Sequence, residues 1–269
     1  MNRLKQDAFL HAEKRFVPYI MSGHPNYESS VEIALMLERA GAAALEWGVP
    51  FSDPLADGPV IQSAGDYARA RGASLHKALE GAKEARARGL SIPMILFTYI
   101  NPVLSAGADE VLDRMQDAGM DGILIPDLPF EESGPLREAA KARGISLISL
   151  VAPSSRTRMK KISREGDGFI YYVTSLGVTG TRENFSENLQ KSIEEVREAA
   201  DVPVLAGFGI SKPEHVSFFH SIADGVIVGS ALVRCISERA ERLEDQSTRE
   251  AALNEIEAFI DDLTSKQKG

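Results

Sequence analysis

The chain has 269 residues, of which 43% are hydrophobic and 26% charged, and its formal net charge is −9. This length can bury one large core, so we expect one domain over residues 1–269, while the acidic balance argues against a partner bound through nucleic-acid phosphates. No stretch reaches the roughly 20 apolar residues of a membrane helix, and the first fifteen residues are too charged for a secretory signal. We therefore expect a cytoplasmic protein that contacts no membrane.

The predicted elements begin with a short helix, in which Leu4, Ala8 and Phe9 form an apolar face suited to covering the floor of a barrel. Eight strand-like runs follow in chain order, at residues 15–21, 43–47, 93–98, 122–126, 145–151, 168–173, 202–206 and 224–228. Most of these runs are apolar throughout, as parallel strands are when helices cover them.

The segments between these runs carry apolar residues at helical spacing. Examples are Leu75, Ala78, Leu79 and Ala82, then Leu189, Ile193 and Val196, and finally Leu253, Ile256, Ile260 and Leu263 after a Ser247/Glu250 capping box. Four helices end at glycines that favour a left-handed cap, Gly41, Gly89, Gly119 and Gly144. This alternation predicts an α/β fold, a single (β/α)8 TIM barrel with an extra N-terminal helix and short extra helices in the βα loops. An open doubly wound sheet is the alternative, although such sheets usually stop at about six strands.

In a barrel, chemistry belongs to the loops after the strands, and the loop after the second run is rich in carboxylates. Glu46 ends an apolar strand, where desolvation should raise its pKa and suit it to proton transfer, and Asp57 in the loop could stay ionised. The alternative interpretation is that Glu46 is a solvated strand-end charge and that Asp53 and Asp57 form turns beside prolines.

Three further loops carry glycine and polar residues. The long loop over residues 174–184 has the length of an active-site lid, although a plain connector is the alternative. Residues 206–211 and 228–231 place glycines directly after the last two strands, and a short helix beginning at Ser230 would direct its positive end toward them. This arrangement favours a phosphate site, although tight turns also use glycine.

Cysteine and histidine give no sign of a metal. Cys235 is the only cysteine, so no internal disulfide forms, and the five histidines lack the spacing of paired ligands. We predict that no metal is bound.

At this point the loops resemble those of the tryptophan synthase alpha chain family. The match is carried by Glu46-x-Gly-Val-Pro-Phe-Ser-Asp-Pro-Leu-Ala-Asp-Gly-Pro, which ends at Pro59. Shorter matches follow in the same order, at Tyr99-x-Asn101-Pro102, Pro126-Asp127-Leu128-Pro129, residues 177–180, residues 207–211 and Gly229-Ser230. The resemblance extends from about Phe16 to the final helix.

The resemblance implies a lyase that splits indole-3-glycerol phosphate into indole and glyceraldehyde 3-phosphate. Glu46 would exchange protons with the indole ring and the glycerol hydroxyl, and Asp57 would hold the indole N–H. A fixed carboxylate stabilises positive charge that develops at nitrogen, so the cleavage requires no metal or Schiff base. No cofactor is expected in this chain.

The resemblance also implies binding residues and a partner. Those for the substrate are Tyr19, Ile61, Phe97, Tyr99, Leu124, Tyr171 and Thr179, and those for its phosphate are Gly180, Phe208, Gly209, Gly229 and Ser230. For the pocket walls, a role as ordinary barrel core is the alternative. The expected partner is a pyridoxal-phosphate β chain in an α2β2 complex, contacted through Asp53, Asn101, Pro129 and an exposed Phe130, and receiving the indole through a tunnel.

Two residues depart from the family pattern, and two other functions compete with it. Trp47 is bulkier than expected and should pack under the helices, because neighbouring strand residues point to opposite faces, and His24 stands where an aspartate is common.

One competing function is that of another phosphosugar enzyme on the same barrel, such as an isomerase or the synthase that makes indole-3-glycerol phosphate. The other is a binding module that only activates a partner, for which Glu46 and Asp57 would be dispensable.

Overall fold

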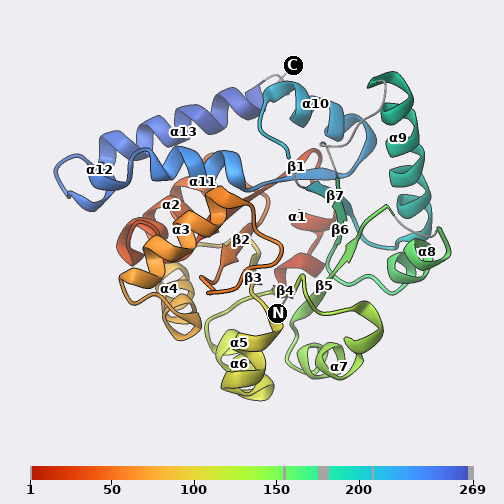
Figure 1. The fold of residues 1–269 in the computed structure, drawn as a ribbon, viewed down its shortest axis with the longest axis horizontal. Coiled ribbons are helices and arrows are strands. Elements are labelled where there is room, and N and C mark those ends of the chain that lie inside the picture. Colours follow the sequence, from red (N-terminus) through yellow and green to blue (C-terminus); the bar gives the residue numbers. More distant parts are fainter. Residues whose placement is uncertain (1, 154–155, 175–181, 208, 266–269) are drawn as a thin grey trace.

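The computed structural model describes residues 2–153, 156–174, 182–207 and 209–265. Its strands are β1 Arg15–Met21, β2 Leu45–Gly48, β3 Met94–Phe97, β4 Gly122–Leu124, β5 Ser146–Val151, β6 Ile170–Val173, β7 Val204–Gly207 and β8 Gly225–Val228. Neighbours in sequence pair in parallel, and β8 pairs with β1, so the sheet closes into a barrel (Figure 1). The predicted barrel is confirmed, and the open sheet is excluded.

Helices form the outer ring. They are α2 Tyr27–Arg39, α4 Leu75–Ala87, α6 Ala108–Asp117, α7 Gly134–Ala142, α8 Arg156–Arg164, α9 Arg182–Ala199, α10 Pro213–Ile222, α12 Ala240–Glu244 and α13 Arg249–Ser265. Additional helices lie in the βα loops, as predicted: α3 Pro59–Ala70, α5 Ile100–Ala106 and α11 Ser230–Ser237. The four predicted glycine caps, from Gly41 to Gly144, have φ values of 90°, 104°, 69° and 71°, which residues with a Cβ rarely adopt.

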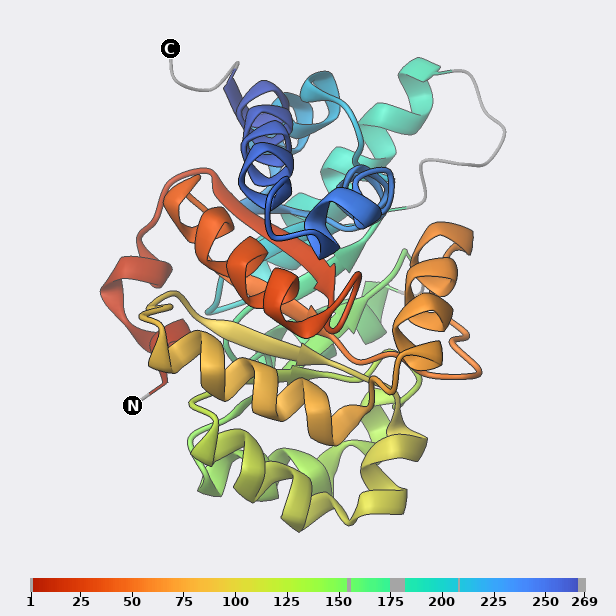
Figure 2. The same cartoon turned by 90° about the vertical axis from the view of Figure 1, so that its left-hand side faces the viewer.

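The opening segment covers the barrel floor as two short turns, η1 Arg3–Lys5 and α1 Asp7–Leu10. Figure 2 places it at the end opposite to that toward which the strand arrows point. Leu4 and Phe9 are buried in the barrel interior. The Asn2 amide donates to the Asp121 carbonyl at 2.8 Å and to the Gly144 carbonyl at 2.9 Å, which fixes the segment to the floor.

The alternation of side chains along β2 places Glu46 and Trp47 on opposite faces. Glu46 pairs in register with Tyr19 of β1, and both point into the barrel. Trp47 is fully buried under the helices, where its Nε1 donates to the Ala78 carbonyl of α4 at 2.9 Å. The predicted orientation of Trp47 is therefore confirmed.

Two helix starts differ from the prediction. The loop predicted over residues 174–184 ends earlier than expected, because α9 begins at Arg182. The capping box before α13 is wrong, because Asp245 rather than Glu250 accepts from the Ser247 backbone N–H, at 2.8 Å. The helix begins at Arg249, one residue later than a cap at Ser247 would place it, since the Asp245 side chain already holds the preceding turn.

Candidate active site

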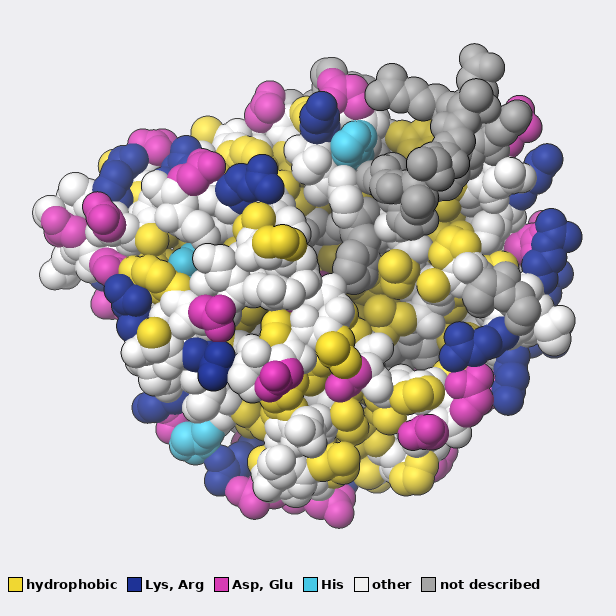
Figure 3. Space-filling view, viewed as in Figure 1, with side chains coloured by type: hydrophobic (Ala, Val, Ile, Leu, Met, Phe, Trp, Pro, Cys, Tyr) yellow, Lys and Arg dark blue, Asp and Glu magenta, His cyan; other side chains and the backbone are white. Residues whose placement is uncertain are grey.

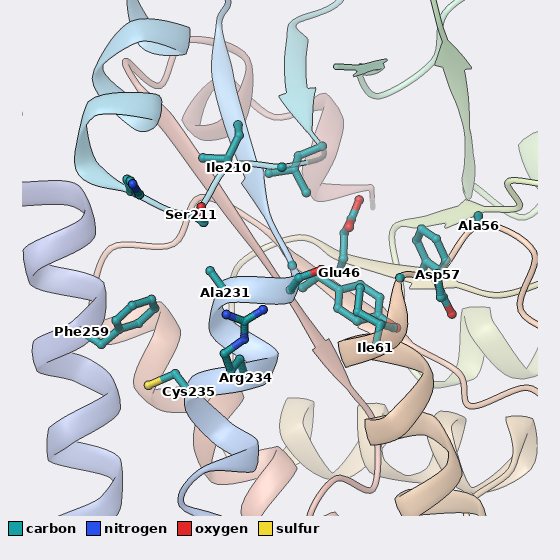
Figure 4. Close-up of a pocket in the computed structure, with 18 of the residues that line it drawn as sticks. Glu46, Ala56, Asp57, Ile61, Ile210, Ser211, Ala231, Arg234, Cys235 and Phe259 are labelled. Atoms are coloured by element: carbon teal, nitrogen blue, oxygen red, sulfur yellow. The ribbon is translucent and has the colours of Figure 1, made fainter. Parts of the chain in front are cut away.

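A cavity of about 840 Å³ opens at the carboxyl ends of the strands. Figure 3 looks onto this mouth, where apolar side chains gather around the hollow and charged side chains occupy the rim. The cavity extends from Glu46 and Asp57 past the loops after β7 and β8 to Phe259 of α13 (Figure 4). Its position agrees with the general location of active sites in parallel barrels.

Glu46 is a buried carboxyl at the inner end of this cavity. The side chain is 1% exposed, and its Oε1 has no hydrogen-bond partner in the described part of the chain. Burial raises the pKa of Glu46 to about 8, because a charged carboxylate loses its hydration here. At neutral pH the group is mostly protonated, so it is poised to give a proton and then take one back.

Asp57 lines the same cavity in a different environment. Burial raises the pKa of Asp57 to about 6, while a hydrogen bond from the Tyr99 hydroxyl opposes the rise. The Tyr99 oxygen also accepts from the Ala56 N–H at 3.1 Å, which orients that hydroxyl toward the carboxylate. At pH 7 Asp57 is therefore mostly ionised while Glu46 is mostly protonated, and such a pair can divide acid and charge-stabilising roles.

Two tyrosines lie across the barrel because the neighbouring strands end in glycine. A Cβ at Gly48 would lie 2.1 Å from the Tyr19 hydroxyl oxygen, and a Cβ at Gly207 would lie 2.4 Å from that of Tyr171. Any other residue at either position would displace a ring. The two glycines therefore shape the inner cavity as much as the two tyrosine rings do.

The predicted substrate residues separate into three groups. Tyr19, Ile61, Phe97 and Tyr171 line the cavity together with Glu46 and Asp57. Tyr99 stands behind Asp57, and Leu124 is fully buried in the barrel interior beneath the cavity, so neither is part of its wall. Thr179 lies outside the described residues.

The predicted phosphate residues meet on the outer side of the cavity. Gly209, Gly229 and Ser230 line it, and α11 begins at Ser230 as predicted. Gly180 and Phe208 lie outside the described residues. Ser211, from the loop predicted to bind phosphate, lines this side as well, and so do Lys212 and Arg234, which sequence reasoning missed. Of these, the helical spacing of Arg234 four residues after Ser230 is a signal that was available.

The residues predicted to contact a partner lie at the mouth. Asp53, Asn101 and Pro129 are exposed, and Leu55 and Leu104, at 85% and 62% exposure, are the large apolar side chains left open among the described residues. The expectation of an exposed Phe130 is wrong. Its ring is half-buried against the core because the Arg137 guanidinium lies over it, 5.1 Å from the centroid.

The two departures from the family pattern lie away from the cavity. Trp47 faces the helices, and His24 is buried against the end of α11, where its Nε2 lies 2.9 Å from the Ser237 hydroxyl oxygen. Burial lowers the pKa of His24 to about 4, so the ring is neutral at pH 7. Neither residue changes the surface that a ligand would contact.

The described ranges contain no group of three or more His, Cys, Asp or Glu side chains placed to hold a metal ion. Within the same ranges, no helix has the length and apolarity needed to cross a membrane.

The fold and the site define a parallel (β/α)8-barrel enzyme whose cavity joins a buried proton-exchanging carboxyl to glycine-rich loops after the last two strands. The family model described as tryptophan synthase alpha chain matches residues 6–261. The alpha chain of Geobacillus kaustophilus is 49% identical over 250 residues, 93% of each chain, and that of Halalkalibacterium halodurans is 46% identical over 98% of this chain and 100% of its own. The chain belongs to the tryptophan synthase alpha chain family.

Solved structures agree with this assignment. Tryptophan synthase subunit alpha from Legionella pneumophila superposes with a TM-score of 0.83 at 34% identity, over 97% of this chain and 99% of that one. A chain from the tryptophan synthase a2b2 complex of Pyrococcus furiosus gives a TM-score of 0.80 at 34% identity, over 93% of this chain and 98% of that one.

Proposed function

We propose that Glu46 and Asp57 catalyse, in this chain, the reaction of its family, the cleavage of indole-3-glycerol phosphate into indole and glyceraldehyde 3-phosphate. The observation that carries the proposal is the pairing of two carboxyls of unlike pKa, about 8 and about 6, in one cavity. The reaction needs both an acid and a fixed negative charge at neutral pH.

Protonated Glu46 gives its proton to C3 of the indole ring, which leaves positive charge on the ring nitrogen. Ionised Asp57 accepts a hydrogen bond from the indole N–H and stabilises that charge. The carboxylate of Glu46 then takes the proton of the hydroxyl next to the bond that breaks, so the C–C electron pair returns to the ring and an aldehyde forms. Glu46 ends the cycle protonated, as it began, and the step calls for no cofactor in this chain.

The remaining cavity suits the two ends of the substrate. Tyr19, Phe97 and Ile61 provide apolar surface beside Glu46 for the indole ring. The phosphate would lie at the other end, against Gly209, Gly229 and Ser230, where backbone N–H groups and the start of α11 favour an anion. Gly180, Phe208 and Thr179 keep the phosphate and loop roles that the resemblance implies.

The exposed face at the mouth would bind the partner. Asp53, Asn101 and Pro129 are exposed in the segments after β2, β3 and β4, as are the side chains of Leu55 and Leu104, and a combined apolar and polar surface of this kind suits a protein interface. We propose that a pyridoxal-phosphate β chain docks here in an α2β2 complex and receives the indole. A biosynthetic enzyme of this type would work in the cytoplasm.

The test is indole release from indole-3-glycerol phosphate by the purified chain, with and without a tryptophan synthase β chain. Slow release that the partner accelerates is the expected result. Glu46→Gln should reduce kcat at least about a thousandfold and leave the affinity for inorganic phosphate unchanged, because it removes a titratable proton and little volume. Glu13→Gln, an identical change at an exposed site, is the matched control. Undiminished release by Glu46→Gln would reject the role of Glu46, and no release by the unmodified chain in either mixture would favour a binding module.

A further inference from the structure

The outer wall of the cavity carries a cation that the reaction described above does not use. Arg234 lies four residues after Ser230 in α11 and lines the same cavity as Gly229 and Ser230. Helical side chains lean toward the N-terminus, and residues four apart share a face, so Arg234 covers the turn that begins at Ser230. Figure 4 shows its guanidinium beside this first turn, close to Ala231.

Arg234 has no ion pair with any residue that the structure describes, unlike the arginines that follow it. Arg239 lies 2.9 Å and Arg242 lies 2.8 Å from carboxylate oxygens of Glu255. The carboxylate one turn beyond Arg234, Glu238, pairs with Arg239 at 3.6 Å. Arg234 therefore keeps its full charge available on the cavity side of α11.

A second cation borders the same end of the cavity. Lys212 follows β7, lines the cavity with Ser211, and is exposed without an ion pair in the described part of the chain. Glu46 and Asp57 lie at the other end, and the one carboxylate of the lining near Arg234, Glu238, is paired with Arg239, which also lines the cavity. In a chain with a net charge of −9, Arg234 and Lys212 are a local exception that favours an anion at one end only.

We propose that Arg234 is a further substrate-binding residue, which together with Lys212 holds the phosphate dianion and fixes the direction in which the substrate lies in the cavity. The inference rests on the proposed function, because it takes the anion at the loops after β7 and β8 to be the substrate phosphate. A guanidinium suits this task, since its N–H groups match two phosphate oxygens at once.

The experiment measures KM for indole-3-glycerol phosphate and the inhibition constants of inorganic phosphate and of indole, which compete for opposite ends of the cavity. Arg234→Gln should raise KM and the inhibition constant of phosphate about tenfold, because it removes one partly solvated charge-assisted hydrogen bond. The inhibition constant of indole should change less than about twofold. Lys212→Gln should act in the same direction with a smaller effect, because a lysine gives one point contact. Arg39→Gln and Lys141→Gln are the matched controls, because they remove exposed cations on α2 and α7 that lie outside the cavity and have no ion pair with the residues described in the structure.

The outcomes separate the two proposals. A rise in the phosphate constant that exceeds the rise for indole, and that shrinks as salt is added, supports the assignment of Arg234. Equal changes for phosphate and indole, or a change no larger than that of Arg39→Gln, would overturn it while the unmodified chain still releases indole. Absence of release by the unmodified chain would instead refute the proposed function.

Discussion

Replacing Glu46 by glutamine should stabilise the fold as well as stop the reaction, and the gain should grow with pH. The native pKa of Glu46 is about 8 against an ordinary value of 4.5, so the folded chain holds a proton on Glu46 between these values that the unfolded chain has lost. The stability of the unmodified chain therefore falls as pH rises through this window and levels off above pH 8. Glutamine does not ionise, so the stability of the Glu46→Gln chain does not fall in this way.

The size follows from the pKa difference. The difference between the native pKa of about 8 and the ordinary 4.5 lowers the free energy of unfolding by at most about 5 kcal/mol at pH 9, and about 1 kcal/mol of this loss is already present at pH 5. The difference in free energy of unfolding between Glu46→Gln and the unmodified chain should thus increase by about 4 kcal/mol between pH 5 and pH 9.

Urea unfolding at pH 5, 7 and 9 measures this difference, provided that the slope with urea is the same for both chains. Glu13→Gln makes the same chemical change on the surface and should show a difference below about 1 kcal/mol at every pH. A difference for Glu46→Gln that stays constant with pH, or that grows toward acid, would refute the reasoning from burial.

Three other predictions concern the pH profile, the glycine at the end of β2 and the tryptophan beside Glu46. Because activity needs protonated Glu46 and ionised Asp57, kcat/KM should peak near pH 7, midway between their pKa values of about 8 and about 6, and fall on both sides. A profile that still rises at pH 9 would contradict the roles assigned to the two carboxyls. Gly48→Ala would place a Cβ 2.4 Å from Cζ of Tyr19 and should reduce kcat/KM about a hundredfold in an indole-release assay. Gly134→Ala, where a Cβ would meet nothing within 4 Å, is the control and should leave kcat/KM unchanged. Equal effects of the two substitutions would count against the steric argument. Trp47→Phe loses the hydrogen bond to Ala78 and should lower the free energy of unfolding, measured with urea, by about 2 kcal/mol. KM should stay within about twofold of the value for the unmodified chain. A changed KM at unchanged stability would instead place Trp47 in the pocket.

The fold followed from the sequence because each strand is a short apolar run ended by turn residues. The run predicted at 15–21 coincides with β1, and the others are displaced by no more than about two residues at either end, as is usual for element boundaries. The start of α13 was missed because Ser247 and Glu250 have the spacing of a capping box, yet a third residue, Asp245, forms a tighter local turn. Competition between two local hydrogen-bond patterns cannot be resolved from spacing alone.

The site was less fully predictable. Glu46 was identified from its place at the end of an apolar strand, and the direction of its pKa shift follows from that place. The hydrogen bond from the Tyr99 hydroxyl to Asp57 depends on how closely the loops after β3 and β2 approach each other, which no local sequence pattern records. The half-buried Phe130 depends in the same way on Arg137, which lies on the following helix and covers its ring.

The anchoring of the barrel floor bears on how the chain acquires its fold during synthesis. Asn2 and Arg3 contact Asp121, which follows them by more than a hundred residues, and Asn2 also reaches Gly144 and Ser146. These partners leave the ribosome long after Asn2 and Arg3 do, so the floor stays open until the fifth strand has been made. Leu4 and Phe9 remain without their barrel contacts for that whole interval, and contacts of such high sequence separation form slowly. The nascent chain therefore carries two apolar side chains that chaperones could bind before the barrel shelters them.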